Sequence, residues 1–66
     1  MSIQVNGEAR ELPEDNTITG VLAALDVPEQ GVAVAVDGVV VRRAEWQSTV
    51  VGDGAQVEIL TAVQGG

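Results

Sequence analysis

The 66-residue sequence predicts an α+β domain of two layers, in which one helix packs on one face of a β-sheet. Three observations predict this class. Strand-like segments with alternating or valine-rich patterns occur in both halves of the chain, Asn-Gly and Asp-Gly turns connect two pairs of them, and one apolar stripe at helical spacing lies between the pairs. The predicted order is therefore two strands, a helix, a second strand pair and a last strand.

The amino-terminal segment is a predicted β-hairpin. Ser2 to Val5 alternates polar and apolar residues, as a half-buried strand does. Asn6-Gly7 follows, and both central positions of a type I′ turn need the positive φ that these residue types tolerate. The return strand, Glu8 to Leu12, then places Glu8 opposite Val5 and ends at Pro13. Because a charged residue faces the apolar side there, the hairpin tip is expected to project past the core.

A short amphipathic helix comes next. Its candidate N-caps are Asp15, Asn16 and Thr17. Its apolar stripe, at i, i+3, i+4 and i+7, consists of Ile18, Val21, Leu22 and Leu25. The stripe closes at Asp26, and Gly20 weakens the helix by about 1 kcal/mol relative to alanine. A helix of this length is not stable alone, so it must pack on the sheet.

A second hairpin is predicted from Val32 to Val36 and from Val39 to Val41, around the turn Asp37-Gly38. In this register Val36 faces Val39. One face of the hairpin then carries Val32, Val34, Val36, Val39 and Val41, and the other carries Ala33, Ala35 and Val40. The bulky valine face is suited to receive the helix, whereas the alanine face is expected to stay open.

The remainder of the domain contains one more strand. Arg42 to Gly52 shows no regular pattern, and Trp46 within it is expected to close the rim of the core. Asp53-Gly54 marks a turn before the last predicted strand, Gln56 to Thr61. In that strand Leu60 points to the face opposite the one that packs on the helix.

The chain ends in Gly65-Gly66, beyond this last strand. Neither residue has a side chain, so the reactive group is the Gly66 carboxylate, which is ionised at neutral pH. Residues without a Cβ atom can pass through a narrow channel that a branched residue would block. We therefore expect a folded domain at residues 1–61 and a flexible tail at residues 62–66, which extends roughly 17 Å and is presented to the active site of another protein.

Composition excludes several classes of function. Cysteine, histidine, lysine and tyrosine are absent, which removes the usual nucleophiles, the usual base and any thiolate metal site. The net charge of −7 disfavours nucleic acid and anionic membranes, and it suits a basic protein surface. The amino terminus does not resemble a signal peptide, and no apolar stretch is long enough to span a membrane. We expect a cytoplasmic protein, not an enzyme, with no cofactor or metal of its own.

Three stretches together resemble the ThiS family, the small sulfur carriers of thiamine biosynthesis. They are Val5-Asn6-Gly7-Glu8, Arg43-Ala44-Glu45-Trp46 and the ending from Val57 to Gly66. The most specific element is Thr61-Ala62-Val63-Gln64-Gly65-Gly66, in which Gln64 replaces the glycine usual in the family. The resemblance covers the whole chain. It implies a ubiquitin-like β-grasp fold, with a mixed sheet of four to five strands, one helix on one face and a protruding Gly-Gly tail.

The resemblance also implies chemistry at Gly66 that partners catalyse. An E1-like adenylating enzyme would activate the carboxylate with ATP, which this chain does not itself bind. A persulfide, supplied by a sulfur donor such as a cysteine desulfurase, would convert it into a thiocarboxylate, and thiazole synthase would take the sulfur. The residues implied to contact partners are Leu60, Ala62, Val63, Gln64 and Gly65, with Ala33 and Ala35 beside Leu60 in a docking patch. The free protein is expected to be a monomer.

Three alternatives remain open from the sequence. The chain resembles, less closely, the sulfur carriers of molybdopterin synthesis, which are generally longer and end differently. It also fits a ubiquitin-like modifier that is conjugated to target lysines through Gly66. A passive interaction domain with an inert tail is the third alternative. Removal of Gly66 separates the last alternative from the others, because only a passive domain tolerates it.

Overall fold

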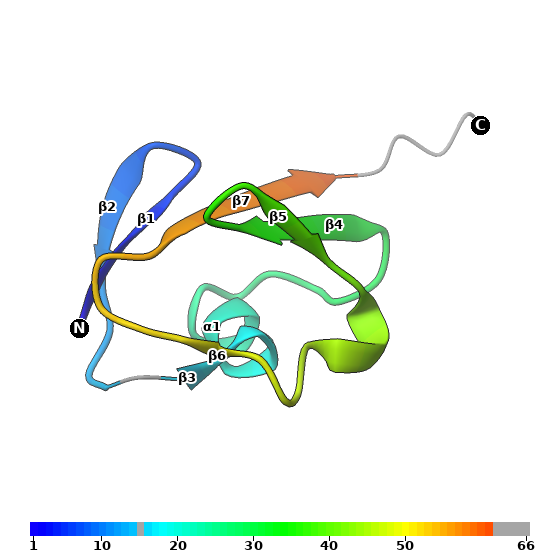
Figure 1. Ribbon diagram of the computed structural model, residues 1–66, viewed down its shortest axis with the longest axis horizontal. Coiled ribbons are helices and arrows are strands. Elements are labelled where there is room, and N and C mark those ends of the chain that lie inside the picture. Colours follow the sequence, from blue (N-terminus) through cyan, green and yellow to red (C-terminus); the bar gives the residue numbers. More distant parts are fainter. Residues whose placement is uncertain (15, 62–66) are drawn as a thin grey trace.

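A computed structural model describes residues 1–14 and 16–61, which form a mixed five-stranded sheet with one α-helix on one face (Figure 1). This is the predicted α+β class, with the ubiquitin-like β-grasp arrangement of strands and helix. The elements in chain order are β1 (Ser2–Val5), β2 (Glu8–Glu11), β3 (Asn16–Thr17), α1 (Ile18–Ala24), β4 (Val32–Val36), β5 (Val39–Val41), the 3-10 helix η1 (Arg43–Glu45), β6 (Val50–Val51) and β7 (Gln56–Thr61).

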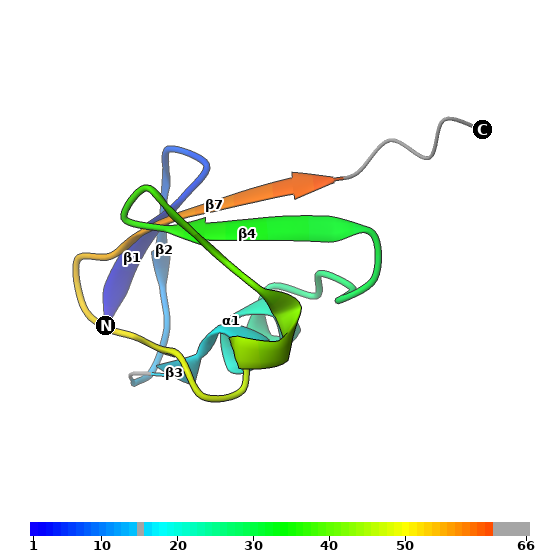
Figure 2. The same ribbon diagram turned by 45° about the vertical axis from the view of Figure 1, so that its right-hand side comes forward.

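The last strand of the chain lies in the middle of the sheet. The strand order is β2-β1-β7-β4-β5, with β7 parallel to β1 and antiparallel to β4. Figure 2 shows β7 and β4 side by side along their length. Helix α1 covers one face of the sheet, and the other face is left open (Figure 2). The strand that leads to the carboxyl terminus is therefore paired on both edges at Gln56 and Val57, and with β4 alone from there to Thr61.

Both predicted hairpins form in the predicted register. Asn6 and Asp37 each have φ of 51°, and the glycine that follows each of them has φ of 84°. Val5 lies opposite Glu8 in the first hairpin, and Val36 lies opposite Val39 in the second. The first tip projects past the core as expected, because Glu8 faces the apolar side and is nevertheless exposed.

The core lies between the sheet and α1. Its buried members are Ile3, Leu12, Ile18, Val21, Leu22, Val34, Trp46, Val51, Ala55 and Val57. The valine face of the second hairpin packs on this core as predicted, except at Val39, which is 66% exposed because it lies at the hairpin tip. Trp46 is buried, as expected for a residue that closes the core. None of the helices in the described ranges is long and apolar enough to cross a bilayer.

Helix α1 begins at one of the three predicted caps and ends at the last residue of the predicted apolar stripe, Leu25, which is its C-cap. The Oγ1 of Thr17 accepts a hydrogen bond from the backbone N–H of Gly20 at 3.1 Å; the candidate cap Asp15 lies outside the described residues. The apolar stripe closes at Asp26 as predicted, because α1 ends at Ala24 with Leu25 as its C-cap. Asp26 has φ of 60°, and the next N–H bonds back across the helix end, which closes the helix in the way a glycine often does.

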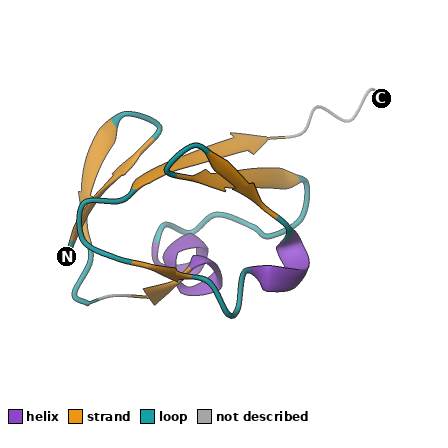
Figure 3. Cartoon of the chain, viewed as in Figure 1, coloured by secondary structure: helices purple, strands orange, loops and turns teal. Residues whose placement is uncertain are grey.

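The segment predicted as irregular is partly regular. It contains η1 and the short strand β6, which pairs with β3 through Thr17 opposite Val50. Figure 3 shows the two helical segments on the same side of the five-stranded sheet. The β3–β6 ladder connects the start of α1 to the segment after Trp46. The helix is therefore held by this ladder as well as by the sheet, and the sequence pattern did not predict the ladder.

Candidate functional site

The predicted reactive end of the chain lies outside the described residues. This applies to Gly66 and to the four predicted partner-contacting residues before it, which are Ala62, Val63, Gln64 and Gly65. The structure describes the chain as far as Thr61, the last residue of β7. The site can therefore be built from the strand that leads to residues 62–66 and from its two faces.

An apolar patch lies on the sheet face that α1 leaves open. Leu60 is 66% exposed and lies opposite Ala33 on β4. Ala35, on the same strand, lies opposite Val40, which is 71% exposed. We call these four residues, Leu60, Ala33, Ala35 and Val40, the open-face patch. The sequence correctly placed all four on this face, although only the first three were assigned to the docking patch.

The surroundings of the open-face patch on β7 and β1 are polar, and they include the acid Glu58. Glu58 is exposed and lies opposite Ala35, and Gln56 follows in the same alternation along β7. Across the sheet, Gln4 lies opposite Gln56 and Glu11 lies opposite Ser2. A small apolar area with a polar rim resembles the composition of protein–protein contact surfaces. Glu58 and the net charge of −7 favour a partner with basic groups around an apolar centre.

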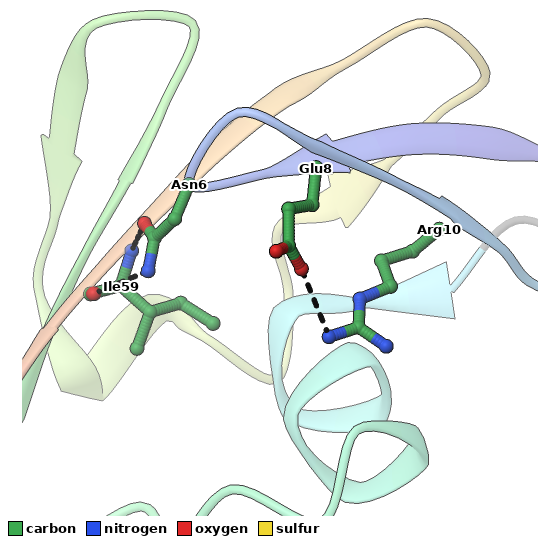
Figure 4. Close-up of polar contacts among 4 residues, drawn as sticks. All are labelled: Asn6, Glu8, Arg10 and Ile59. Atoms are coloured by element: carbon green, nitrogen blue, oxygen red, sulfur yellow. Dashed lines mark hydrogen bonds and ion pairs between the residues drawn. The ribbon is translucent and has the colours of Figure 1, made fainter.

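A side chain from the first turn holds β7 close to its end (Figure 4). The Nδ2 of Asn6 donates to the carbonyl oxygen of Ile59 at 3.0 Å, and the Oδ1 of Asn6 accepts from the N–H of Ile59 at 2.8 Å. The two residues are 53 positions apart in sequence. From the sequence Asn6 is expected in a turn only, because nothing in a local pattern shows that β1 and β7 are neighbours.

A shallow hollow lies on the helix side of the same strand end. Its volume is about 400 Å³, and its apolar lining comes from Val5, Leu25, Val27 and Ile59. The exposed ion pair of Arg10 with Glu8, 3.4 Å between Nη2 and Oε1, lies at its rim (Figure 4). Below this end of β7, next to Thr61, fewer core side chains pack against the strand.

The family model that matches this chain is described as the ThiS family and aligns with residues 3–66. The chain belongs to the ThiS family. The sulfur carrier protein ThiS of Escherichia coli (strain K12) is 30% identical to it over 66 residues, which is the full length of both chains.

Solved ThiS structures have the same fold. The crystal structure of the thiamine biosynthesis protein ThiS from Geobacter metallireducens is 35% identical, with a TM-score of 0.88 and complete coverage of both chains. A solution NMR structure of a thiamine biosynthesis protein from the same organism gives a TM-score of 0.82, again at 35% identity, covering all of this chain and 88% of that one. The resemblance that the three sequence stretches predicted is thereby confirmed.

Proposed function

We propose that this ThiS-family chain is the sulfur carrier of thiazole formation in thiamine biosynthesis, with the Gly66 carboxylate as the group that carries sulfur. The observation that supports this most directly is the extent of the family match, which runs through Gly66. The relative named as a sulfur carrier aligns over its full length, so the match includes the end of both chains. The sulfur-transfer chemistry would belong to partner enzymes, since the chain offers the carboxylate and not a catalytic centre.

The chemistry begins with activation, because a carboxylate is a poor electrophile. An E1-like adenylating enzyme would let a carboxylate oxygen of Gly66 attack the α-phosphorus of ATP, which releases pyrophosphate and forms an acyl-adenylate. The terminal sulfur of a persulfide, loaded by a donor such as a cysteine desulfurase, would then attack the acyl carbon and displace AMP. A second thiol of the partners would cleave the resulting acyl disulfide, which leaves the thiocarboxylate. Thiazole synthase would accept its sulfur.

The absence of lysine and cysteine from the sequence suits this role. An acyl-adenylate reacts with amines and thiols, and these two side chains are the usual sources of both in a protein. The carrier therefore contains few groups that could consume its own activated end. The amino-terminal amine is the remaining candidate, and in the structure the Met1 nitrogen donates a hydrogen bond to the Leu12 carbonyl oxygen.

The structure is consistent with a folded domain that binds the partner and a carboxyl-terminal segment, residues 62–66, that enters its active site. β7 is paired with β4 as far as Thr61, and with β1 at Gln56 and Val57, so the sheet offers a base for residues 62–66. We propose that these residues pass through the partner's channel and that the open-face patch docks on the partner beside it. Leu60 lies one residue before the end of β7, so docking and presentation would involve adjacent parts of one strand.

Mass spectrometry of the intact protein tests this proposal. The chain is incubated with the adenylating enzyme of its own organism, ATP, cysteine and a cysteine desulfurase, and a chain that lacks Gly66 serves as the control. The full-length chain should exchange one oxygen for sulfur, and the control should keep its mass. An unchanged full-length chain would overturn the proposal. In a second incubation with cell extract, conjugates on heavier proteins would indicate a modifier, and transfer of sulfur to a pterin precursor would indicate the molybdopterin pathway.

A further inference from the structure

Strand β7 extends beyond the end of its parallel neighbour β1. The last backbone hydrogen bond between the two segments runs from the N–H of Asn6 to the carbonyl oxygen of Val57 at 2.9 Å. The chain then turns away through Asn6 and Gly7, with φ values of 51° and 84°. Because β1 ends at Val5, its backbone does not reach the level of Ile59.

The side chain of Asn6 continues the pairing by one step. Its amide bonds both the N–H and the carbonyl oxygen of Ile59, as the close-up shows (Figure 4). The residue types that readily adopt positive φ are glycine, asparagine and aspartate. Among these, only asparagine has a donor and an acceptor on its side chain. The tight turn and the extra step of pairing therefore require the same residue at position 6.

The side chains of β7 are less buried towards its carboxyl end. The two hydrogen bonds from Asn6 therefore contribute more to holding this end of the strand than they would in a well-packed region. Val57 is 2% exposed, Ile59 is half-buried, and Thr61 is exposed. The hollow of about 400 Å³ lies beneath the last two of these residues. On its other edge β7 stays paired with β4 as far as Thr61. The edge towards β1 is thus held near the carboxyl end by Asn6.

We propose that Asn6 is a positioning residue for the reaction at the carboxyl terminus. By holding Ile59 it fixes Thr61, two residues further along, and so the point from which residues 62–66 continue towards a partner's active site. The inference rests on the proposed function. Asn6 touches no reacting atom and acts through β7. Without its amide the end of β7 must be ordered during docking, and that cost weakens binding to the partner.

The second hairpin supplies a matched control. Asp37 has the same φ of 51° and is also followed by a glycine at 84°. Its Oδ1 accepts from the N–H of Gln56 at 2.9 Å, and its own N–H donates to the carbonyl oxygen of Gln56 at 2.7 Å. Asp37 therefore holds the beginning of β7, whereas Asn6 holds a residue near its end. Asn6→Gly and Asp37→Gly each keep a residue that tolerates the turn and remove the side-chain bonds to β7.

Amide hydrogen exchange measured by NMR tests the hydrogen bonds in the free protein. Asn6→Gly should accelerate exchange at the Ile59 amide by about tenfold and leave the Gln56 amide unchanged, because the lost bond is local. Asp37→Gly should show the reverse pattern. An Ile59 amide that exchanges equally fast in the wild-type protein and in Asn6→Gly would overturn the proposal, because the side chain would then not hold β7 in solution.

Adenylation kinetics test the positioning role. ATP–pyrophosphate exchange is measured with the adenylating enzyme of the same organism, at varied concentrations of each full-length carrier. Asn6→Gly should raise KM by about tenfold with kcat unchanged, whereas Asp37→Gly should keep KM within about twofold of wild type. Equal KM values for the two variants would overturn the positioning role alone. A wild-type carrier that is not adenylated would overturn the proposed function, and the exchange data would still show whether the hydrogen bonds form.

Discussion

The indole of Trp46 donates its Nε1–H to the carbonyl oxygen of Val41 at 2.8 Å. This bond joins the end of β5 to the residue that follows η1, so the intervening turn is closed by a side chain. Trp46 is 2% exposed and is the one aromatic residue in the sequence. The same side chain therefore fills the core and satisfies a carbonyl group at the end of a strand.

We expect Trp46→Phe to lower the free energy of unfolding by about 1–3 kcal/mol, because Val41 loses its hydrogen-bond partner while most of the apolar burial is kept. Trp46→Ala should cost about 3–5 kcal/mol, since it also leaves a cavity. Urea unfolding followed by circular dichroism measures both variants without relying on the indole fluorescence. If Trp46→Phe unfolded at the wild-type urea midpoint, the hydrogen bond would contribute nothing measurable to stability.

Local sequence signals predicted most of the fold. The turns at Asn6 and Asp37 need residues that tolerate positive φ, and the two-residue loops then determine the register of each hairpin. Strand alternation correctly placed Leu60 on the open face. These features depend on neighbours in the sequence, and so they can be read without knowledge of the tertiary structure.

The features that the sequence did not reveal depend on contacts between distant segments. The β3–β6 ladder joins Thr17 to Val50 with only two residues in each strand, which is too short for a periodic pattern. The bond of Asn6 to Ile59 requires knowing that β7 lies beside β1. The sequence also did not show that Asp26, where the apolar stripe closes, adopts the left-handed conformation.

Gly20 offers a test of how one side chain limits helix stability. A Cβ atom at this position would meet the side chain of Asn16. Gly20→Ala alone should therefore gain little, because the benefit of alanine in a helix is offset by the displacement of Asn16. In an Asn16→Ala background the same change should stabilise the protein by about 0.5–1 kcal/mol. Thermal unfolding of the two single variants and the double variant measures this coupling, and a purely additive result would contradict it.

The carrier proposal predicts a steric series at Gly65. Gly65→Ala should reduce thiocarboxylate formation, and Gly65→Val should reduce it further, by about 100-fold or more, because a branched side chain obstructs a narrow channel. The thermal midpoint should stay at the wild-type value in both variants, since the position follows the last strand. Single-turnover formation of the thiocarboxylate, measured by intact mass, gives the rates. Equal rates for glycine and valine would show that no channel of this kind limits the reaction.

Leu60 and Val39 test the docking role of the open-face patch, because each is 66% exposed and they lie on opposite faces of the sheet. Leu60→Ala should change the free energy of unfolding by no more than about 0.5 kcal/mol, as expected for an exposed side chain. It should weaken binding to the adenylating enzyme by about 10-fold to 100-fold, because an apolar anchor that becomes buried carries much of the energy of an interface. Val39→Ala should bind like wild type. Titration calorimetry measures these affinities, and the same affinity for both variants would place the docking surface elsewhere on the domain.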